Sequence, residues 1–373
     1  MSLSLLEGNE AIARGAVAAG CRFFAGYPIT PATTIYNSML NLLPPLGGIV
    51  LQGEDEIASI AFCLGASMAG MKVMTATSGP GISLFSEHIS FAVGSEIPIV
   101  IVDVQRLGPS TGSATRGADG DINFLRWSNS GGLPVIVLAP VDVDDCFTLT
   151  MQAFNLAEKL RCPVLIASNK EIGMTRESID LDALEKPEII DRMPPPAGQH
   201  YLPFQVAVGQ SVPYFLPIGG NVPVRQTSST HGQNGYITTD HEEIAITLDR
   251  LQTKLESAID QFSFYEFIKS QKAETLIITY GVTARAAKAA YEEIKEQTNP
   301  VSVLILKTLW PVPESIIRQT AQSYKRVLVV EMNLGQYVRE INRILPDMHI
   351  DFLGQMNGRL ITPRQIMEKI ANG

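Results

Sequence analysis

The sequence predicts an α/β protein with two domains joined by a long linker, and three observations lead to this prediction. The chain has 373 residues, which is too long for one ordinary hydrophobic core. Short apolar runs such as "PIVIVDV" and "PVLIAS" alternate with segments of helical period, which indicates a parallel sheet covered on both faces. The alternation dissolves after residue 184 and resumes near residue 262. We therefore expect a large α/β domain over 1–184, a linker with one helix over 185–261, and a smaller α/β domain over 262–373.

The apolar period changes repeatedly along the first domain, and each change predicts an element. Apolar runs of five to eight residues read as strands, and longer amphipathic stretches read as helices. The expected order is helix 10–20, strand 22–28, helix 32–43, strand 48–52, helix 55–70, strand 72–77, helix 81–94, strand 98–104, strand 133–140, helix 143–160 and strand 163–168.

The linker and the second domain follow the same logic. Residues 185–234 are rich in proline and glycine without a period, which is typical of a long connection. One helix follows at 241–260. The second domain is then expected as strand 274–281, helix 284–297, strand 301–311, helix 313–324, strand 326–333 and helix 336–345.

Composition excludes several classes of function. A net charge of -9 and a pI near 5.2 give no electrostatic footprint for nucleic acid or an anionic membrane. Only 18% of residues are charged, so we expect part of the surface to be covered by other subunits, including copies of this chain. The four cysteines are far apart, with no CxxC pair for zinc or an iron-sulfur cluster. Without an apolar span or a signal peptide, a cytoplasmic protein is expected.

The stretch "GEDEIAS" places three acids at a helix start, and Glu56 is the most informative of them. Glu54 and Asp55 suffice to complement the helix dipole, and a dipole role is the alternative for all three. The residues from Ile57 to Met71 carry no charge, so we expect that helix to be buried. A carboxyl group at its start would then be desolvated, which favours its neutral form and proton exchange.

Three further stretches follow expected strands, where ligands collect in parallel sheets. In "GYPITP", two prolines hold the backbone around Thr30. "TATSGPG" resembles an anion-binding turn, although a tight turn at a subunit contact is the alternative, and it lacks the phosphate-loop ending. The polar stretch "VDVQRLGPSTGSATRGADGDINFLRW" offers Arg106, Arg116 and Arg126 as candidates to bind a carboxylate, each against the alternative of a solvated arginine.

The remaining polar residues are weaker candidates. The five histidines show no metal spacing, and His231 in "STHG" is read as a loop-packing residue. "GADGDIN" lacks the spacing of a metal-diphosphate motif. No nucleophile with a matching base can be assembled.

Taken together, "GYPITP", "GEDEIAS", "TATSGPG" and "VDVQRLGPSTGSATR" closely resemble, in order and spacing, the alpha subunit of the 2-oxoacid:ferredoxin oxidoreductases, within them the 2-oxoglutarate branch. The resemblance covers nearly the whole chain. It implies a thiamine diphosphate enzyme, with a pyrimidine-type domain first and a transketolase C-terminal-like α/β domain second.

The resemblance also assigns roles to residues. It implies that Glu56 shares a proton with the aminopyrimidine ring and that Thr30 lies near the incoming oxoacid. The carboxylate-binding arginine falls on Arg116, with Arg126 as the competitor. The other residues expected to bind cofactor are Tyr27, Pro28, Ile29, Pro31 and Gly79. Two motifs depart from the family pattern, "PSTGSATRGADGD" and "THGQNG", and both are expected near the active site, so pyruvate or a branched-chain oxoacid stays open beside 2-oxoglutarate.

The resemblance finally implies partners. Because this chain lacks cluster cysteines and a metal-diphosphate motif, a beta subunit is expected to supply the [4Fe-4S] cluster and Mg²⁺, with thiamine diphosphate shared between the two chains. A separate gamma subunit, ferredoxin and coenzyme A complete the set. Two alternatives from other classes are a stand-alone ligand-binding module and a non-catalytic scaffold subunit.

Overall fold

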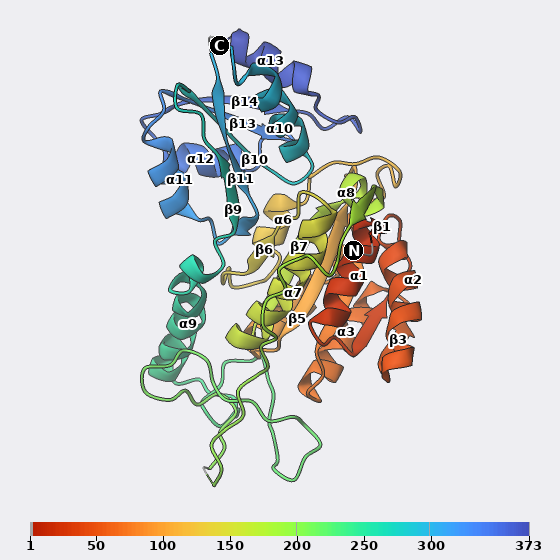
Figure 1. Ribbon diagram of the computed structural model, residues 1–373. Helices are drawn as coiled ribbons and strands as arrows, with labels where there is room; N and C mark the ends of the chain where they lie inside the picture. Colours follow the sequence, from red (N-terminus) through yellow and green to blue (C-terminus); the bar gives the residue numbers. More distant parts are fainter. Residues whose placement is uncertain (1–2, 199, 298, 373) are drawn as a thin grey trace.

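The computed structural model describes residues 3–198, 200–297 and 299–372 and shows two α/β units stacked end to end (Figure 1). The larger unit contains a seven-stranded sheet in the order β12-β6-β7-β5-β4-β2-β3. All of its strands are parallel except β12, which pairs antiparallel with β6. The strands are β2 (Phe23–Gly26), β3 (Ile49–Gln52), β4 (Val73–Thr77), β5 (Ile99–Gln105), β6 (Ile136–Leu138), β7 (Pro163–Asn169) and β12 (Thr308–Trp310).

Helices cover both faces of this sheet, as the apolar strands predict. Along β5, alternate residues belong to two separate buried clusters: Val100 and Val102 to one, Ile99 and Ile101 to the other. The helices of this unit are α1 (Gly8–Ala18), α2 (Thr33–Leu42), α3 (Glu56–Met68), α4 (Gly79–Leu84), α5 (Ser86–Gly94), α6 (Ile122–Arg126), α7 (Val143–Leu160) and α8 (Lys170–Met174), with a short 3-10 turn at Pro44–Leu46.

Two local expectations for this unit need correction. The single helix expected over 81–94 is two helices, α4 and α5, which meet at Phe85. A small antiparallel sheet of β1 (Ser4–Glu7) and β8 (Arg176–Ile179) was not predicted. Each of its strands has only four residues, which is too few for a periodic signal.

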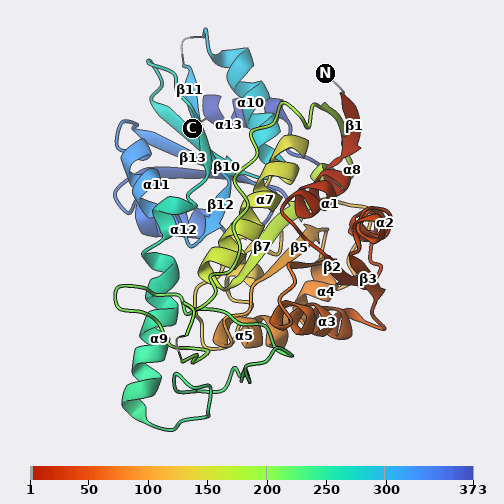
Figure 2. The same cartoon turned by 60° about the horizontal axis from the view of Figure 1, so that its bottom comes forward.

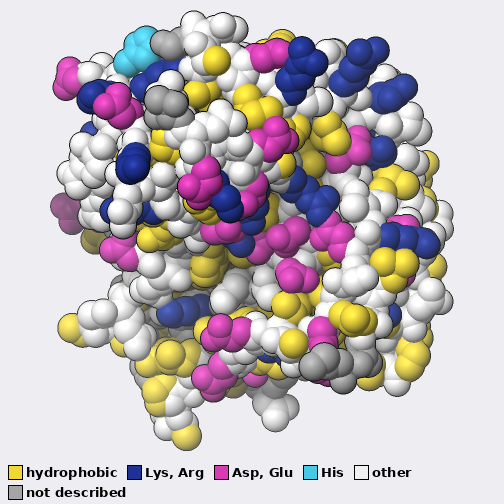
Figure 3. All heavy atoms as spheres, turned by 45° about the horizontal axis from the view of Figure 1, so that its top comes forward, with side chains coloured by type: hydrophobic (Ala, Val, Ile, Leu, Met, Phe, Trp, Pro, Cys, Tyr) yellow, Lys and Arg dark blue, Asp and Glu magenta, His cyan; other side chains and the backbone are white. Residues whose placement is uncertain are grey.

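The smaller unit holds a five-stranded sheet in the order β14-β13-β10-β11-β9, in which only β9 runs antiparallel. Its elements are β9 (Tyr265–Ile268), β10 (Thr275–Tyr280), α10 (Thr283–Ile294), β11 (Val301–Leu306), α11 (Glu314–Ala321), β13 (Arg326–Glu331), α12 (Val338–Ile344), β14 (His349–Gly354) and α13 (Pro363–Ala371). On the face over this unit, Lys and Arg side chains intermingle with Asp and Glu side chains (Figure 3).

The run expected as one strand over 301–311 is divided between the two sheets. It leaves the smaller sheet after Leu306 and enters the larger one at Thr308. Lys307 marks the crossing: its carbonyl accepts from the Ala139 amide at 2.7 Å, and its ammonium lies 2.6 Å from a carboxylate oxygen of Asp145. The strand Thr308–Trp310, from the third predicted segment, therefore completes the first sheet. We propose that the boundaries between the large domain, the linker and the smaller domain lie after residues 184 and 261.

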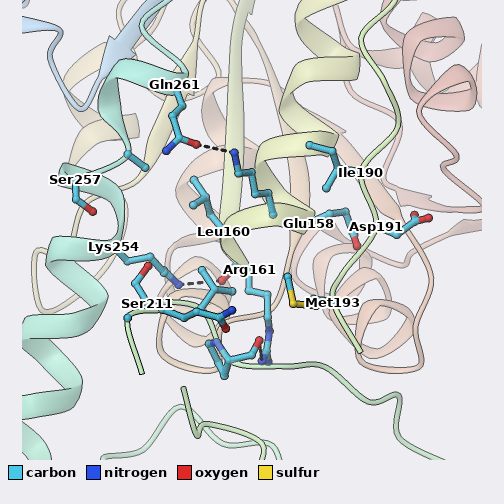
Figure 4. A pocket seen from close by; sticks show the side chains of 16 residues that line it. Glu158, Leu160, Arg161, Ile190, Asp191, Met193, Ser211, Lys254, Ser257 and Gln261 are labelled. Atoms are coloured by element: carbon cyan, nitrogen blue, oxygen red, sulfur yellow. Dashed lines mark hydrogen bonds between the residues drawn. The ribbon is translucent and has the colours of Figure 1, made fainter. Parts of the chain in front are cut away.

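The linker runs across the end of the larger sheet opposite the smaller unit (Figures 1 and 2) and leads into α9 (His241–Glu256) and the short turn η2 (Ile259–Gln261). Arg161, at 2% exposed, holds it by donating to the carbonyls of Pro203, Pro213 and Tyr214. A cavity of about 360 Å³ lies between α7, the linker and α9, with Arg161 and Lys254 in its wall (Figure 4). Among the described helices, none is long and apolar enough to cross a membrane.

Candidate active site

The polar turns singled out by the sequence gather at the carboxyl ends of β2, β4 and β5. The turn at 27–31 follows β2, the start of α4 follows β4, and the loop 106–121 follows β5. In a parallel sheet these ends meet at one edge, which is the usual position of a ligand site.

The three acids at the start of α3 take three different positions. Glu54 is exposed. Asp55 is the N-cap, and its carboxylate accepts from the Ala58 amide at 2.7 Å. Glu56, the first helical residue, is only 9% exposed and turns toward α4, where a Cβ added at Gly81 would lie 2.8 Å from its Oε1 atom. The capping role thus belongs to Asp55, and the turn "SGPG" gives Glu56 its room.

The expectation that the uncharged helix is buried is wrong for the single chain. Its inner face is buried, but Ile57 and Phe62 on the outer face are 44% and 45% exposed. Ala61 and Gly65 lie on the same outward side. The outer face of α3 is therefore an apolar surface next to Glu56.

The turn at Thr30 is held from behind by two side chains. Asn9, fully buried in α1, donates to the Pro31 carbonyl at 2.9 Å and to the Thr34 hydroxyl at 2.7 Å. Arg106 donates to the Thr30 carbonyl at 2.7 Å. The Thr30 side chain itself faces outward, as does that of Tyr27, while Pro28 and Ile29 are half-buried and Pro31 is buried. Sequence reasoning missed Asn9, because an asparagine inside a helix pattern carries no positional signal.

The three candidate arginines are separated by the fold. Arg106 is 7% exposed, and its second nitrogen donates to the Thr111 carbonyl at 2.9 Å, so it ties the Thr30 turn to the following loop. Arg116 is exposed and lies over Gly358 of the smaller unit, where an added Cβ would come 3.0 Å from its own.

Arg126 lies elsewhere. Its guanidinium stacks 4.2 Å from the ring centroid of Trp127 and 5.9 Å from that of Trp310, in a groove of about 690 Å³ that Glu256 and Glu340 also line. This groove lies between α6, η2 and β12, whereas Thr30 is at the end of β2. The structure thus brings Arg106 to Thr30 and gives Arg126 other contacts.

The loop "GADGD" fastens the two units together. The Asp119 amide donates to the Met332 carbonyl at 2.9 Å, and Asn333 donates back to the Asp119 carbonyl at 2.9 Å. The Asp119 carboxyl accepts from Asn169 at 2.7 Å. Burial raises the pKa of Asp119 to about 7, with Asn169 acting against the rise and Glu331 adding to it. Sequence reasoning expected a ligand-collecting loop here and gave no sign of its inter-domain role.

Within this chain, the motif "THGQNG" does not lie near this edge of the sheet. His231 stacks on Phe204 with 3.8 Å between ring centroids, and its Nδ1 atom lies 2.7 Å from the Ser229 carbonyl. Ser228 packs against Gly94, just before the start of β5 and therefore at the opposite end of the sheet. The reading of His231 as a loop-packing residue agrees with these contacts.

A parallel sheet with a buried glutamate at a helix start, a proline turn at the end of the neighbouring strand and a second α/β unit fits the class of protein that the sequence resembles. That class has the pyrimidine-type domain of a thiamine diphosphate enzyme, followed by a transketolase C-terminal-like domain. Comparison with known proteins agrees and narrows the class.

Residues 14–250 match the family described as "Pyruvate flavodoxin/ferredoxin oxidoreductase, thiamine diP-bdg", and residues 273–366 match "Pyruvate:ferredoxin oxidoreductase core domain II". The 2-oxoglutarate synthase subunit KorA of Methanothermobacter marburgensis is 40% identical over 98% of this chain and 97% of its own length. The ketoisovalerate oxidoreductase subunit VorB of Methanothermobacter thermautotrophicus is 34% identical over 99% and 97%. The chain belongs to the 2-oxoacid:ferredoxin oxidoreductase family, which confirms the resemblance seen in the sequence.

A solved structure extends this to three dimensions. The 2-oxoglutarate:ferredoxin oxidoreductase from Magnetococcus marinus, with 2-oxoglutarate, coenzyme A and succinyl-CoA bound, superposes with a TM-score of 0.92 at 30% identity. The match covers 99% of this chain and 65% of that one, so this chain spans about two thirds of its neighbour's length.

The residues at the site fit one end of thiamine diphosphate. Glu56 offers a carboxyl group, and the buried Thr77 and Ser78 hydroxyls beside it have no hydrogen-bond partner among the described residues. An aminopyrimidine ring needs such polar partners beside apolar walls. Within the described part of the chain, no group of three or more His, Cys, Asp or Glu residues is arranged to hold a metal ion.

Proposed function

We propose that this chain is the alpha subunit of a 2-oxoacid:ferredoxin oxidoreductase that converts 2-oxoglutarate and coenzyme A to succinyl-CoA and carbon dioxide, or runs in reverse, with ferredoxin as electron carrier. The observation that carries the proposal is the position of Glu56, buried at the start of α3 in a chain that matches this family over nearly its whole length. Pyruvate and branched-chain oxoacids remain the alternative substrates, since the ketoisovalerate subunit also matches over the full chain.

The proposed roles follow the geometry. Glu56 would hold and exchange a proton at a pyrimidine nitrogen of thiamine diphosphate. When bound, the cofactor would supply the electron sink for the loss of carbon dioxide. Thr30 lies on the open side of its turn and orients the oxoacid, while Arg106 fixes the turn behind it. Arg116 binds the substrate carboxylate, with Arg126 as the competitor.

The remaining site residues line the cofactor. Tyr27, Pro28, Ile29 and Pro31 form the wall next to Thr30. Gly79 begins α4 and has no side chain, which leaves room beside Asp121. A Cβ added at Gly79 would lie 3.4 Å from the Oδ2 atom of Asp121. These assignments rest on position at the sheet edge and on the family resemblance.

The proposed assembly needs other chains. A beta subunit supplies Mg²⁺ and the [4Fe-4S] cluster and binds the diphosphate end of the cofactor, and a gamma subunit and ferredoxin complete the enzyme. The apolar outer face of α3 supports a subunit contact next to Glu56. The four cysteines are free and buried, which supports a reducing cytoplasm as the compartment.

The test is the pair of variants Glu56→Gln and Glu54→Gln in the reconstituted complex. Glutamine keeps the size of Glu56 but cannot exchange a proton, so we expect deuterium exchange at the thiazolium C2 atom to slow by about 10²- to 10⁴-fold. The exposed Glu54 should be replaceable with little effect. Equal exchange rates in the wild type and Glu56→Gln would refute the assignment and favour the non-catalytic scaffold alternative.

A further inference from the structure

Asn9 is a fully buried side chain of α1 that joins three elements. Its Nδ2 atom donates to the carbonyl of Pro31 at 2.9 Å, at the end of the Thr30 turn (residues 27–31), and to the hydroxyl of Thr34 at 2.7 Å, in the first turn of α2. These two bonds use both hydrogens of the amide nitrogen. Asn9 therefore fastens the Thr30 turn and the helix that follows it to α1.

The orientation of the Asn9 amide follows from these partners. A carbonyl oxygen only accepts, so the nitrogen must face Pro31 and the Oδ1 atom must face away. Oδ1 has no donor among the residues that the structure describes. It lies against Gly173 of α8, where an added Cβ would come 2.5 Å from Oδ1 and 3.1 Å from Cγ. A side chain at position 173 would therefore push the amide out of its place.

The packing of α8 on α1 gives this contact little freedom. A Cβ added at Gly8 would overlap the carbonyl oxygen of Ile172, so the two helices meet backbone to backbone. The helix α8 is fixed in turn by its N-cap Asn169, whose side chain accepts from the Ile172 amide at 2.9 Å. Gly173 thus offers a fixed surface behind the Asn9 amide.

We propose that Asn9 is a positioning residue for the Thr30 turn and that the absence of a side chain at Gly173 keeps its amide in place. Arg106 holds the Thr30 carbonyl at 2.7 Å, so side chains from two elements hold two consecutive carbonyls of the turn. The Thr30 side chain is left facing outward. Only the effect of Asn9 on the oxoacid rests on the proposed function, because the hydrogen bonds themselves do not depend on it.

The expected effect of losing the Asn9 amide is a loss of position. Pro31 is buried, so its carbonyl, once it loses this donor, must move to find another or stay unpaired at a cost. A displacement of about 1 Å near reacting atoms can lower a rate by about 10²-fold. Glu56 begins another helix, α3, so its proton exchange should not depend on Asn9.

Asn155 is a matched control for Asn9. It is also a buried asparagine inside a helix, α7, and is 5% exposed. Its side chain donates to the Glu188 carbonyl at 2.7 Å and accepts from the Ile190 amide at 2.9 Å. Asn155 therefore fastens the linker, whereas Asn9 fastens the Thr30 turn.

The first experiment reads the position of Thr30 without any activity. Proton-carbon NMR of the full chain, labelled at threonine methyl groups, gives a Thr30 signal that Thr30→Ser assigns by loss. We expect Asn9→Ala to move this signal, because the turn loses its donor, and Asn155→Ala to leave it in place. An unmoved Thr30 signal in Asn9→Ala would overturn the proposal.

Gly173→Ala tests the second part of the proposal and leaves the Asn9 amide present. We expect it to move the Thr30 signal in the wild-type background. It should add little in the Asn9→Ala background, where the amide that it displaces is gone. The same added shift in both backgrounds would show that Gly173 acts independently of Asn9 and would refute its part in the proposal.

The second experiment compares two measurements on the reconstituted complex: kcat/KM for the oxoacid, and deuterium exchange at the thiazolium C2 atom of bound thiamine diphosphate. Asn9→Ala should lower kcat/KM by about 10- to 100-fold and leave the exchange rate within about threefold of wild type. Asn155→Ala should leave both within about threefold. Equal losses in the two measurements, or in the two asparagine variants, would indicate general damage and refute the positioning role.

These experiments separate the inference from the proposed function. A Thr30 signal that moves in Asn9→Ala, in a chain whose complex converts no oxoacid, would keep the contact role of Asn9 and refute the proposed function alone. An active complex whose kcat/KM is unchanged in Asn9→Ala would refute the positioning role and leave the proposed function in place.

Discussion

Glu54, Asp55 and Glu56 show how position divides the work among three neighbouring acids. Asp55 caps the helix, Glu54 faces solvent and Glu56 faces inward. The charge pattern alone favoured a helix-dipole role for all three acids. In the structure, such a role accounts only for Asp55, the N-cap of α3. At the residue scale, the direction of each side chain therefore decides its role, and Glu56 is the acid that turns into the protein.

The arginines give a residue-scale prediction. If Arg116 binds the substrate carboxylate, Arg116→Lys should raise KM for the oxoacid by one to a few orders of magnitude, because lysine cannot replace a two-pronged pair worth about 2 to 4 kcal/mol. The KM for coenzyme A should hardly change. Steady-state kinetics of the reconstituted complex measures both. The matched variant Arg126→Lys should have little effect on KM, and the reverse result would transfer the role to Arg126.

At the scale of elements, the linker is fastened by a buried charge cluster. Glu96, before β5, lies 2.7 Å from Arg250 and 2.8 Å from Lys254, both on α9 (Lys254 is seen in Figure 4). Burial alone would raise the pKa of Glu96, but the two cations outweigh it and lower the pKa from 4.5 to about 2. The linker that precedes α9 is thereby held to the larger sheet through this helix.

This cluster predicts a pH-dependent stability. Because the folded-state pKa of Glu96 lies below its unfolded value, the stabilisation is present above about pH 4.5 and is lost as the pH falls toward 2. Glu96→Gln should lower the free energy of unfolding by about 3 kcal/mol at pH 7, and the difference should shrink below pH 4. Urea unfolding at several pH values measures this.

The control for this prediction is an ion pair near the surface. Glu266 and Lys288 are each 36% exposed, so Glu266→Gln should cost less than about 1 kcal/mol. A loss at pH 7 as small for Glu96→Gln as for Glu266→Gln would show that the cluster does not fasten α9.

At the scale of the whole molecule, the outer face of α3 is an apolar surface in a chain whose relatives are named as subunits. Ile57 and Phe62 lie on it beside Glu56. An exposed apolar surface of this kind usually marks a contact with another protein. The site is therefore expected to be complete only after assembly.

Phe62→Glu tests this expectation. A charge on the apolar face should block assembly with the beta subunit and weaken self-association, while the isolated chain keeps its melting temperature. Sedimentation measures assembly, and calorimetry should show weak or no binding of thiamine diphosphate to the isolated chain. Ile246→Glu, on the exposed side of α9, is the control and should assemble normally. Normal assembly of Phe62→Glu would place the subunit contact elsewhere.

The sequence by itself determined most strands and helices of the two α/β units, the parallel sheet covered on both faces, and the family. These follow from apolar periods within single elements and from four short motifs in register, which are local properties of the chain. It also singled out Thr30 and Glu56 through the motifs around them. It missed the short strands β1, β8 and β9 and the final elements β14 and α13.

The tertiary structure alone decided which distant residues meet. Arg106 holds Thr30 and Asn9 holds Pro31, although no period or spacing links these residues. The passage of the chain at Lys307 from the smaller sheet into the larger one was likewise decided by the tertiary structure. Such contacts depend on how completed elements pack, because a hydrogen bond between elements needs only two matching atoms and leaves no repeating pattern along the chain.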